Sequence, residues 1–331
     1  MIILGIETSC DETAASICKD QKILSSIVSS QMIHSKFGGV IPEIASREHE
    51  KLLNLIVKEA LFESNTQLES LDAISVTNGP GLSGTLLTGV SFAKGLGLGL
   101  KIPVIPINHL EAHIFANFLA DPNLKFPFVC LLVSGGHTQL WWIKDMNKYI
   151  LLGETRDDAA GEAFDKGARI LGLEYPGGPA IEKISKLGNP NSVRFPRALL
   201  NKGSLEFSFS GLKTSLLYYM DSYNKSDEVS LADIAASYQQ AIIDILIEKM
   251  KRAINYTGAK TCVIAGGVAA NKILRKNIKE NINDIKFLFP DLKYCTDNAA
   301  MVSFLGEVKF SHINKNSIEF GIKPNLKLNK N

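Results

Sequence analysis

Short apolar runs separated by polar turns open the chain and predict three strands. Residues 2–6 form a continuous apolar run, as in a buried strand, residues 14–18 form a second apolar run, and residues 22–28 follow as a third strand. The turn after the first run, residues 7–13, is rich in hydroxyl and carboxylate side chains. The same order of strand, small polar turn, strand, turn and strand returns from residue 127 to residue 152. We interpret the repeat as an internal duplication of architecture, with two lobes that hold a ligand between them.

Helical and strand-like patterns alternate after each of these meanders. Alternation of this kind predicts crossover connections and a partly parallel sheet, and therefore an α/β fold with mixed sheets flanked by helices. Residues 175–179 are expected to form a sharp loop, and residues 190–228 an irregular insertion. Helices are expected at 42–64, 82–100, 109–120, 157–171, 231–256, from the 266–271 loop to about 281, and 299–310; further strands are expected at 72–77, 102–108, 260–265 and 287–289.

The repeat also predicts the domain organisation. Residues 1–125 should form an N-terminal lobe that a C-terminal helix, residues 298–325, completes. Residues 126–297 should form the C-terminal lobe, which carries the insertion at 190–228.

Composition sets the broad class of the protein. The chain has 331 residues, of which 45% are hydrophobic and 21% charged, as is usual for a globular protein. The net charge of +2 neither requires nor excludes a nucleic-acid partner. Five dispersed cysteines without a C-x-x-C pair indicate a reducing compartment. With no basic leader and no apolar run of ~18 residues, we expect a cytoplasmic protein that does not span a membrane.

Two histidines four residues apart, His109 and His113, follow the predicted strand at 102–108. Positions i and i+4 lie only ~40° apart around a helix, so both imidazoles should face the same way. Such a pair can bind one metal ion, and ligands of open α/β folds gather at strand ends. Two partly buried histidines at a helix start are the alternative, and the pair alone leaves both interpretations open.

Glycine turns and carboxylates supply further candidates. The segment from Val133 to His137 could hold an acyl or phosphate group, although a plain glycine hairpin explains it as well. Gly266 and Gly267, between a strand and a helix start, are a plausible nucleotide platform. Asp157 and Asp158 fit helix-dipole pairing, whereas Asp165 lies further along and should point into a cleft. Asp297 precedes a small-residue helix, and its position alone favours an N-cap over a metal ligand.

Taken together, the motifs resemble one known family. They are GIETSCDET, HLEAH, LLVSGGHTQL, DDAAGEAFDKGARILGL, YPGGP, FSFSGLKT, AGGVAAN and CTDNAAM, in order from the first strand to about residue 310. This set is similar to the TsaD family of tRNA threonylcarbamoyladenosine biosynthesis proteins, which belongs to the actin-like superfamily of two-lobed ATP-binding folds. A two-lobed fold agrees with the duplicated meander.

The resemblance implies an acyltransferase that moves the threonylcarbamoyl group from threonylcarbamoyl-AMP to N6 of the adenosine beside the anticodon, in tRNAs that read codons starting with A. It implies one iron or zinc ion. It also implies tRNA as a partner, a separate synthase that supplies the acyl-adenylate and, in a bacterium, a TsaB-like paralogue and a TsaE-like ATPase.

The resemblance also assigns site residues. The ion would be bound by His109, His113 and Asp297, and Asp11 and Glu12 would lie near the reaction centre. Many relatives have aspartate where this chain has Glu182, so the longer carboxylate is expected to reach the ribose differently here. The expected contacts with the acyl-adenylate are Val133, Ser134, Gly135, Gly136, His137, Asp165, Gly178, Glu182 and Asn271.

Three alternative functions fit the residues less well. A zincin protease needs Glu directly after the first histidine, but here Glu111 lies ~200° around the helix from His109. An ATPase or sugar kinase of the same superfamily would use Mg²⁺ through carboxylates and needs no histidine pair. A non-catalytic scaffold should lack the two histidines and the aspartate.

Overall fold

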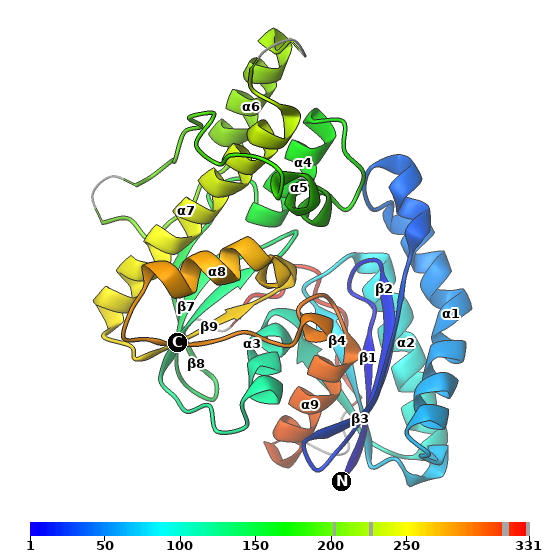
Figure 1. Cartoon of the computed structure of the whole chain (residues 1–331). Coiled ribbons are helices and arrows are strands. Elements are labelled where there is room, and N and C mark those ends of the chain that lie inside the picture. Colours follow the sequence, from blue (N-terminus) through cyan, green and yellow to red (C-terminus); the bar gives the residue numbers. More distant parts are fainter. Residues whose placement is uncertain (201–202, 225–227, 313–317, 329–331) are drawn as a thin grey trace. The chain divides into compact units, whose positions relative to one another are not determined.

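Two five-stranded mixed sheets, each flanked by helices, organise the chain (Figure 1). The computed structural model describes residues 1–200, 203–224, 228–312 and 318–328. Unit 1 comprises Met1–Pro122 and Thr296–Leu328, and unit 2 comprises Asn123–Cys295. Among the described residues, no helix combines the length and the apolar character that a membrane crossing requires.

The sheet of unit 1 has the strand order β3-β2-β1-β4-β5. The first three strands form an antiparallel meander, and β4 and β5 then add in parallel to β1. The carboxyl ends of the three parallel strands therefore meet at one edge of the sheet. The strands are β1 (Ile2–Glu7), β2 (Glu12–Lys19), β3 (Lys22–Ser30), β4 (Ala73–Gly79) and β5 (Val104–Asn108).

The sheet of unit 2 has the same topology. Its order, β10-β9-β6-β7-β8, again places an antiparallel meander beside two parallel strands. The predicted duplication and the predicted α/β class are confirmed by this match. The strands are β6 (Phe128–Val133), β7 (Thr138–Asp145), β8 (Lys148–Glu154), β9 (Thr261–Ala265) and β10 (Lys286–Leu288).

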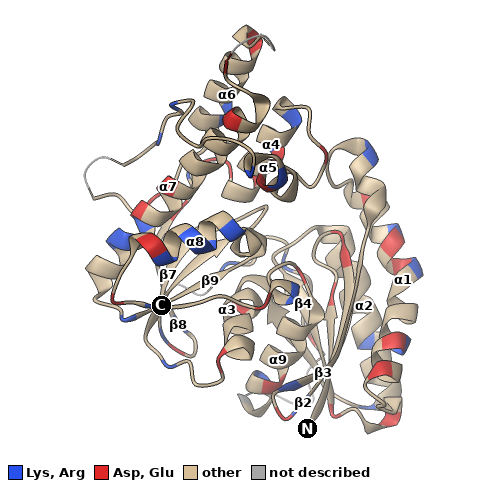
Figure 2. Ribbon diagram, in the orientation of Figure 1, with Lys and Arg blue, Asp and Glu red and all other residues tan. Residues whose placement is uncertain are grey.

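Alternation along β1 determines what packs on each face of the first sheet. Leu4 and Ile6 belong to an apolar cluster with Leu53 of α1 and Val90 of α2. Charged residues of both signs mark the rest of α1 (Figure 2). Gly5 points the other way, toward α9. The helices of unit 1 are α1 (Pro42–Glu63), α2 (Ser83–Leu100), α3 (His109–Ala120) and α9 (Ala299–Lys309).

Glycines let α9 lie directly against the sheet. A Cβ built on Gly5 would lie 2.6 Å from the backbone oxygen of Ala299, and one on Gly306 would lie 2.4 Å from Cβ of Ser75. Real Cβ atoms do not come so close, so both positions require glycine. The start of α9 is thereby held against β1.

A long buried helix, α7, forms the centre of unit 2. Ser230 and Asp233 form a capping box at its start, and Gly258 ends it in the left-handed conformation at φ 66°. Its apolar side chains, among them Ile242 and Leu246, pack in the same core as β6 and β9. The helices of unit 2 are α4 (Ala160–Ile170), α5 (Gly177–Ser185), α6 (Ser210–Ser222), α7 (Leu231–Thr257) and α8 (Lys272–Asn281).

Four expectations about the architecture need correction. The loop expected at 175–179 includes the first turn of α5, and the region expected to be irregular contains α6. The C-terminal helix ends at Lys309, and residues 318–328 are not helical, so a helix over 298–325 is wrong. The chain returns to unit 1 at Thr296 rather than after residue 297. The physical reason is that Cys295 packs in the core of unit 2, whereas the next residues start α9 on the first sheet.

Substitution of Gly5 by alanine should push α9 away from β1. We expect Gly5→Ala to lower the free energy of unfolding by about 1–3 kcal/mol, because the new methyl group meets backbone atoms that cannot rotate away. Gly95 in α2 is the control, since a Cβ there meets nothing within 4 Å. Gly95→Ala should raise stability by up to about 1 kcal/mol. Urea denaturation of both variants tests this; equal stabilities would contradict it.

Candidate functional site

The end of β5 positions both histidines of the predicted pair. Asn108 is the N-cap of α3, and its side-chain oxygen accepts hydrogen bonds from the backbone N–H groups of Leu110 (2.9 Å) and Glu111 (3.2 Å). His109 and His113 therefore occupy the first turns of the helix and share one face. Both are buried, with 8% and 1% of their surface exposed. Asn108, rather than either histidine, caps this helix.

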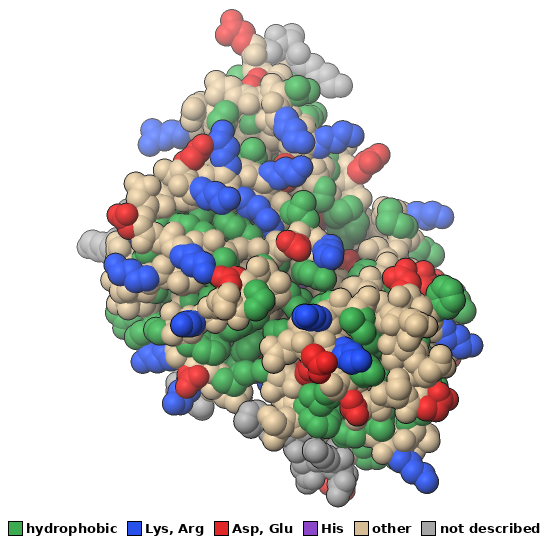
Figure 3. Space-filling view, turned by 60° about the horizontal axis from the view of Figure 1, so that its bottom comes forward, with side chains coloured by type: hydrophobic (Ala, Val, Ile, Leu, Met, Phe, Trp, Pro, Cys, Tyr) green, Lys and Arg blue, Asp and Glu red, His purple; other side chains and the backbone are tan. Residues whose placement is uncertain are grey.

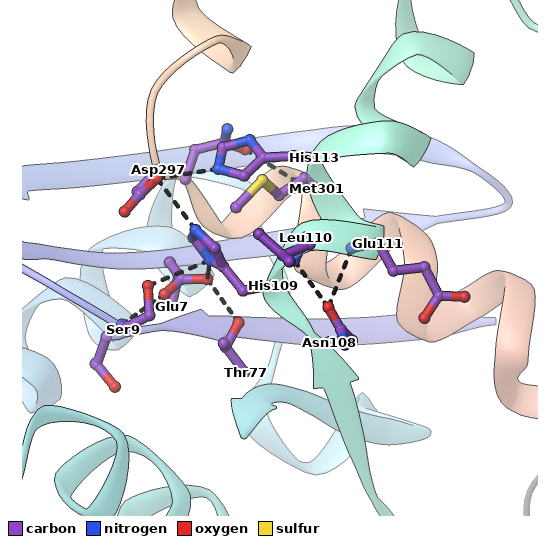
Figure 4. Close-up of polar contacts among 12 residues, drawn as sticks. Glu7, Ser9, Thr77, Asn108, His109, Leu110, Glu111, His113, Asp297 and Met301 are labelled. Atoms are coloured by element: carbon purple, nitrogen blue, oxygen red, sulfur yellow. Dashed lines mark hydrogen bonds and ion pairs between the residues drawn. The ribbon is translucent and has the colours of Figure 1, made fainter. Parts of the chain in front are cut away.

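Three side chains of unit 1 converge in front of these turns. Nε2 of His113 lies 3.1 Å from Oδ1 of Asp297, and Nε2 of His109 lies 3.5 Å from the same oxygen (Figure 4). One potential ligand atom from each residue lies within 4.8 Å of the others. The two imidazole rings stand nearly perpendicular, at 85° with centroids 4.6 Å apart. The structure thus brings together the three residues that were the candidate metal ligands.

Asp297 does not cap α9, contrary to the interpretation from its position alone. The N-cap is the next residue, Asn298, whose side-chain oxygen accepts from the backbone N–H of Met301 at 3.0 Å. Asparagine satisfies the helix end as well as aspartate would. The Asp297 carboxylate is consequently available to the histidines.

A fourth side chain, Glu7, lies behind His109 at the end of β1. Its Oε2 atom lies 3.2 Å from Nδ1 of His109 and accepts a 2.6 Å hydrogen bond from the Thr77 hydroxyl. Its Oε1 atom accepts from the backbone N–H of Ser9 at 2.6 Å. Glu7 is fully buried, and the sequence analysis missed it. A carboxylate at the end of a continuous apolar strand was the available signal, because a buried charge requires partners.

The carboxylates make the space around His109 attractive to positive charge. Burial acts to lower the pKa of His109, but Asp297 and Glu7 outweigh it and hold that pKa well above its usual value. Burial acts to raise the pKa of Asp297, yet His109 keeps the pKa of this carboxyl below its usual range. Burial lowers the pKa of His113, which keeps its imidazole neutral.

This donor set fits a transition-metal ion. Imidazole nitrogens suit iron and zinc, and one carboxylate with two histidines leaves coordination positions open. Neutral His113 has the protonation state that metal binding requires. The residues His109, His113 and Asp297 could therefore hold one divalent ion in unit 1.

The acidic turn that contains Asp11 and Glu12 also belongs to unit 1. Burial, followed by the charge of Asp297, raises the pKa of Glu12 well above its usual value. Buried His49 of α1 holds this turn, since its ring bonds the Thr13 hydroxyl at 2.8 Å and the Cys10 carbonyl at 2.9 Å. The sequence analysis did not single out His49, whose contacts come from a distant helix.

The glycine hairpin of unit 2 begins where β6 ends. The backbone N–H of Ser134 donates to the carbonyl of His137 at 2.8 Å, and the N–H of His137 donates to the Ser134 hydroxyl at 3.2 Å. A Cβ on Gly135 or Gly136 would meet nothing within 4 Å. Space is therefore open on the Cβ side of both glycines, whereas the backbone of Gly135 lies close to Gly161 of α4, where a built Cβ would be 2.8 Å from the N and Cα atoms of Gly135.

The second glycine turn lies beside the first. Gly266 has φ +89°, and a Cβ there would lie 2.3 Å from the backbone oxygen of Val133. Only glycine permits this approach between the ends of β6 and β9. Both predicted backbone-donor turns of unit 2 are therefore neighbours.

Hydrogen bonds link the segments that carry the remaining candidates of unit 2. Oδ1 of Asp165 accepts from the N–H of Gly177 at 2.7 Å, at the start of the helix that carries Gly178. In the same helix, Glu182 accepts from the N–H of Lys272 at 3.3 Å. Asp165 thus holds the start of α5 in place. The sequence predicted only that its carboxylate would face a cleft, and not this contact.

Asn271 is the N-cap of α8. Its Oδ1 atom accepts from the N–H of Leu274 at 2.9 Å, and its Nδ2 atom donates to Gln239 at 2.8 Å. Only 7% of its surface is exposed. Asn271 has a structural role whatever else it contacts.

Asp157 bonds to a distant segment, and Asp158 pairs both with that segment and with the helix that follows it. Asp157 accepts hydrogen bonds from the backbone N–H groups of Phe209 and Ser210, at the start of α6. Asp158 pairs with Lys166 at 2.8 Å and lies 3.6 Å from Lys213. The dipole interpretation is corrected accordingly, because these carboxylates anchor a segment about fifty residues away.

Basic side chains around the insertion are partly neutralised. Arg197 pairs with Asp244 at 2.8 Å, Arg194 is exposed, and Lys202 lies outside the described residues. In Figure 3, Lys and Arg side chains are numerous on the upper part of the face shown, with Asp and Glu among them.

Sequence comparison identifies closely similar proteins. The family model described as tRNA N6-adenosine threonylcarbamoyltransferase matches residues 22–304. Proteins of that name from Thermosipho africanus and Thermosipho melanesiensis are 50% and 51% identical over 331 residues, and each match covers 99% of this chain and 100% of the relative. A protein of the same name from Clostridium kluyveri is 48% identical, over 98% of this chain and 97% of its own.

Solved structures with low sequence identity share the fold. HypF from T. kodakarensis matches with a TM-score of 0.63 at 16% identity, over 94% of this chain and 48% of HypF. Component A of the (R)-2-hydroxyglutaryl-CoA dehydratase of Acidaminococcus fermentans matches with a TM-score of 0.57 at 15% identity, over 94% and 99% of the two chains. These likenesses show that the chain shares its α/β fold with both proteins.

Substitution of Asn271 should separate its structural role from any ligand contact. Asn271→Ala should cost about 1–3 kcal/mol, because the helix loses its cap and the buried Gln239 amide loses a partner. Asn271→Ser keeps the cap and should recover about 1 kcal/mol of this loss. Asn277→Ala, in the same helix, is the control and should change stability by less than about 0.5 kcal/mol. Thermal and urea unfolding check the order; an Asn271→Ala variant as stable as wild type would contradict it.

Proposed function

Because the chain belongs to the family of tRNA N6-adenosine threonylcarbamoyltransferases, we propose that His109, His113 and Asp297 bind one Fe²⁺ or Zn²⁺ ion on which threonylcarbamoyl transfer depends. The observation that carries the proposal is the convergence of these three ligand atoms within 4.8 Å. Family membership supports the reaction, and the ligand group supports the proposed metal centre.

We propose threonylcarbamoyl-AMP as the donor and the adenosine beside the anticodon, in tRNAs that read codons starting with A, as the acceptor. The exocyclic N6 amine attacks the carbamoyl carbonyl, a C–N bond forms, and the bond between that carbon and the phosphate oxygen breaks. AMP leaves and N6 loses one proton. A divalent ion bound by the ligand group would supply Lewis-acid polarisation or orientation of the acyl-adenylate.

The acidic turn of unit 1 contributes the other proposed catalytic groups. The raised pKa of Glu12 favours its protonated form, which can donate a hydrogen bond to a developing oxyanion. Asp11, next to it, is the proposed proton acceptor. Positioning and charge stabilisation supply most of the rate acceleration in such a transfer.

Unit 2 supplies the proposed contacts with the adenylate. The hairpin at residues 133–137 is the proposed contact with the phosphate or acyl group, through the backbone N–H groups of Gly135 and Gly136. Asp165, Gly178, Glu182 and Asn271 are the proposed contacts with the nucleoside part. Two observations support them: the open space in front of Gly136 and Gly178, and the hydrogen bonds that tie their segments together.

The proposed partners follow from the reaction. A separate synthase must supply the acyl-adenylate, which is a reactive mixed anhydride. We further propose a TsaB-like paralogue and a TsaE-like ATPase as protein partners, and a cytoplasmic location together with the tRNA substrate.

Loss of one metal ligand should abolish transfer without unfolding the protein. We expect His113→Ala and Asp297→Ala to lose bound metal and at least about 100-fold of the transfer rate, since affinity depends on the complete ligand set. Their stability loss should stay modest, because these side chains fill little core volume. Melting temperature, bound metal and tRNA modification should be measured on the same preparations.

The matched control is His34→Gln, which alters a buried histidine outside the ligand group. It should retain metal and transfer. If a ligand variant fails to fold, the conservative His113→Gln replaces it. A metal-free variant that modifies tRNA at the wild-type rate would remove the ion from the mechanism.

Methyl groups placed on the open glycines should block the adenylate and spare the fold. A Cβ on Gly136, Gly178 or Gly211 meets nothing within 4 Å, so alanine at each should leave the melting temperature almost unchanged. We expect Gly136→Ala and Gly178→Ala to weaken binding of AMP or ATP about 10-fold or more, and Gly211→Ala in α6 to leave it unaltered. Calorimetric titration provides the measurement. Equal affinities in all three variants would overturn the proposed contacts.

A further inference from the structure

A buried carboxylate stands directly behind one candidate metal ligand. Glu7 is 0% exposed, and its Oε2 atom lies 3.2 Å from Nδ1 of His109. The opposite nitrogen of that ring, Nε2, points toward Asp297 (Figure 4). The imidazole of His109 therefore lies between two carboxylates, one on each ring nitrogen.

Every contact of Glu7 fixes it as an acceptor. The Ser9 N–H donates to Oε1, and the Thr77 hydroxyl donates to Oε2, both at 2.6 Å. An ionised carboxylate has no proton to give, so Nδ1 of His109 must carry the hydrogen between them. In the neutral ring, which is the form that binds a metal, the lone pair of His109 then lies on Nε2, the atom that faces Asp297.

We infer that Glu7 is a positioning residue for the metal centre, which holds His109 in the Nδ1-protonated tautomer so that Nε2 can bind the ion. The carboxylate also restrains the ring orientation and increases the basicity of the ligand nitrogen. This inference rests on the metal site of the proposed function. Thr77 acts one step further away, because its hydroxyl keeps Glu7 ionised and in place.

Ser9 is the competing partner of the same nitrogen, since its hydroxyl also lies 3.2 Å from Nδ1 of His109. A hydroxyl can donate or accept, so it does not impose a tautomer. Ser9→Ala should therefore change metal affinity less than about threefold. A glutamine at position 7 cannot replace the carboxylate, because its NH₂ group would face either Nδ1 of His109 or the Ser9 N–H.

The experiment measures metal affinity directly, on the full chain freed of metal. Co²⁺ is titrated and followed by its visible absorption, and Zn²⁺ affinity is measured by chelator competition. We expect Glu7→Gln to weaken both affinities about 10–100-fold, and Thr77→Val to weaken them several-fold. The Co²⁺ absorption bands of Glu7→Gln should also shift, because a ligand nitrogen has changed its orientation.

The control is Glu111→Gln, the same change at a second buried carboxylate. Glu111 lies in α3 between the two histidines along the chain, but its carboxylate pairs with Lys309. Glu111→Gln should lower stability and leave metal affinity within about threefold of wild type. Equal losses of affinity in Glu7→Gln and Glu111→Gln would reduce Glu7 to a structural role and overturn the inference.

Two further outcomes keep the inference separate from the proposed function. If wild type binds neither Co²⁺ nor Zn²⁺, the proposed metal centre itself fails. If wild type binds both and Glu7→Gln binds them equally well, only the role of Glu7 fails. Should Glu7→Gln not fold, Thr77→Val decides, and an unchanged affinity in that variant would overturn the inference.

Discussion

Direct packing of α9 on β1 is the constraint on which the metal centre depends. Gly5 lets the helix backbone touch the sheet, and Asn298 closes the helix end. Asp297, the residue before this cap, is thereby placed at the carboxyl edge of the sheet, where β1 ends with Glu7 and α3 begins with His109. The ligands come from two segments, α3 and the residues just before α9, and one close approach between backbone atoms brings these segments together.

Charge at this edge is arranged in a line. Glu7, His109 and Asp297 alternate in sign when the histidine is protonated, and a cation on Nε2 would preserve the same alternation. Burial makes an uncompensated carboxylate costly in such a place. The protein therefore holds two acids close together only because something positive lies between them, which can be a proton on the ring or a metal ion. The glycine turns of unit 2 differ from this edge, because small residues without charge, Gly135 and Gly136, have open space on their Cβ side.

The sequence predicted much of this fold because its signals are local. Short apolar runs separated by polar turns predicted both meanders, and the helical spacing of apolar residues placed the ends of α1, α3 and α7 close to where they are observed. The failures came where the decisive partner is distant. The start of α6 depends on Asp157, about fifty residues earlier in the chain, whose carboxylate accepts from two backbone N–H groups there. The sequence of α6 alone does not reveal this distant partner. Glu7 and His49 were missed for the same reason, whereas spacing predicted the histidine pair because a single helix carries both.

The ligand group joins parts of the chain that are far apart in the sequence and are therefore synthesised at different times. His113 and Asp297 are separated by 184 positions. During synthesis the two histidines leave the ribosome long before the aspartate, and the whole of unit 2 is made between them. A nascent chain can thus offer metal only a two-histidine half-site with low affinity. The complete centre can form only after the segment that carries Asp297 and starts α9 has been made, so a chain that stopped before this segment would lack one of the three ligands.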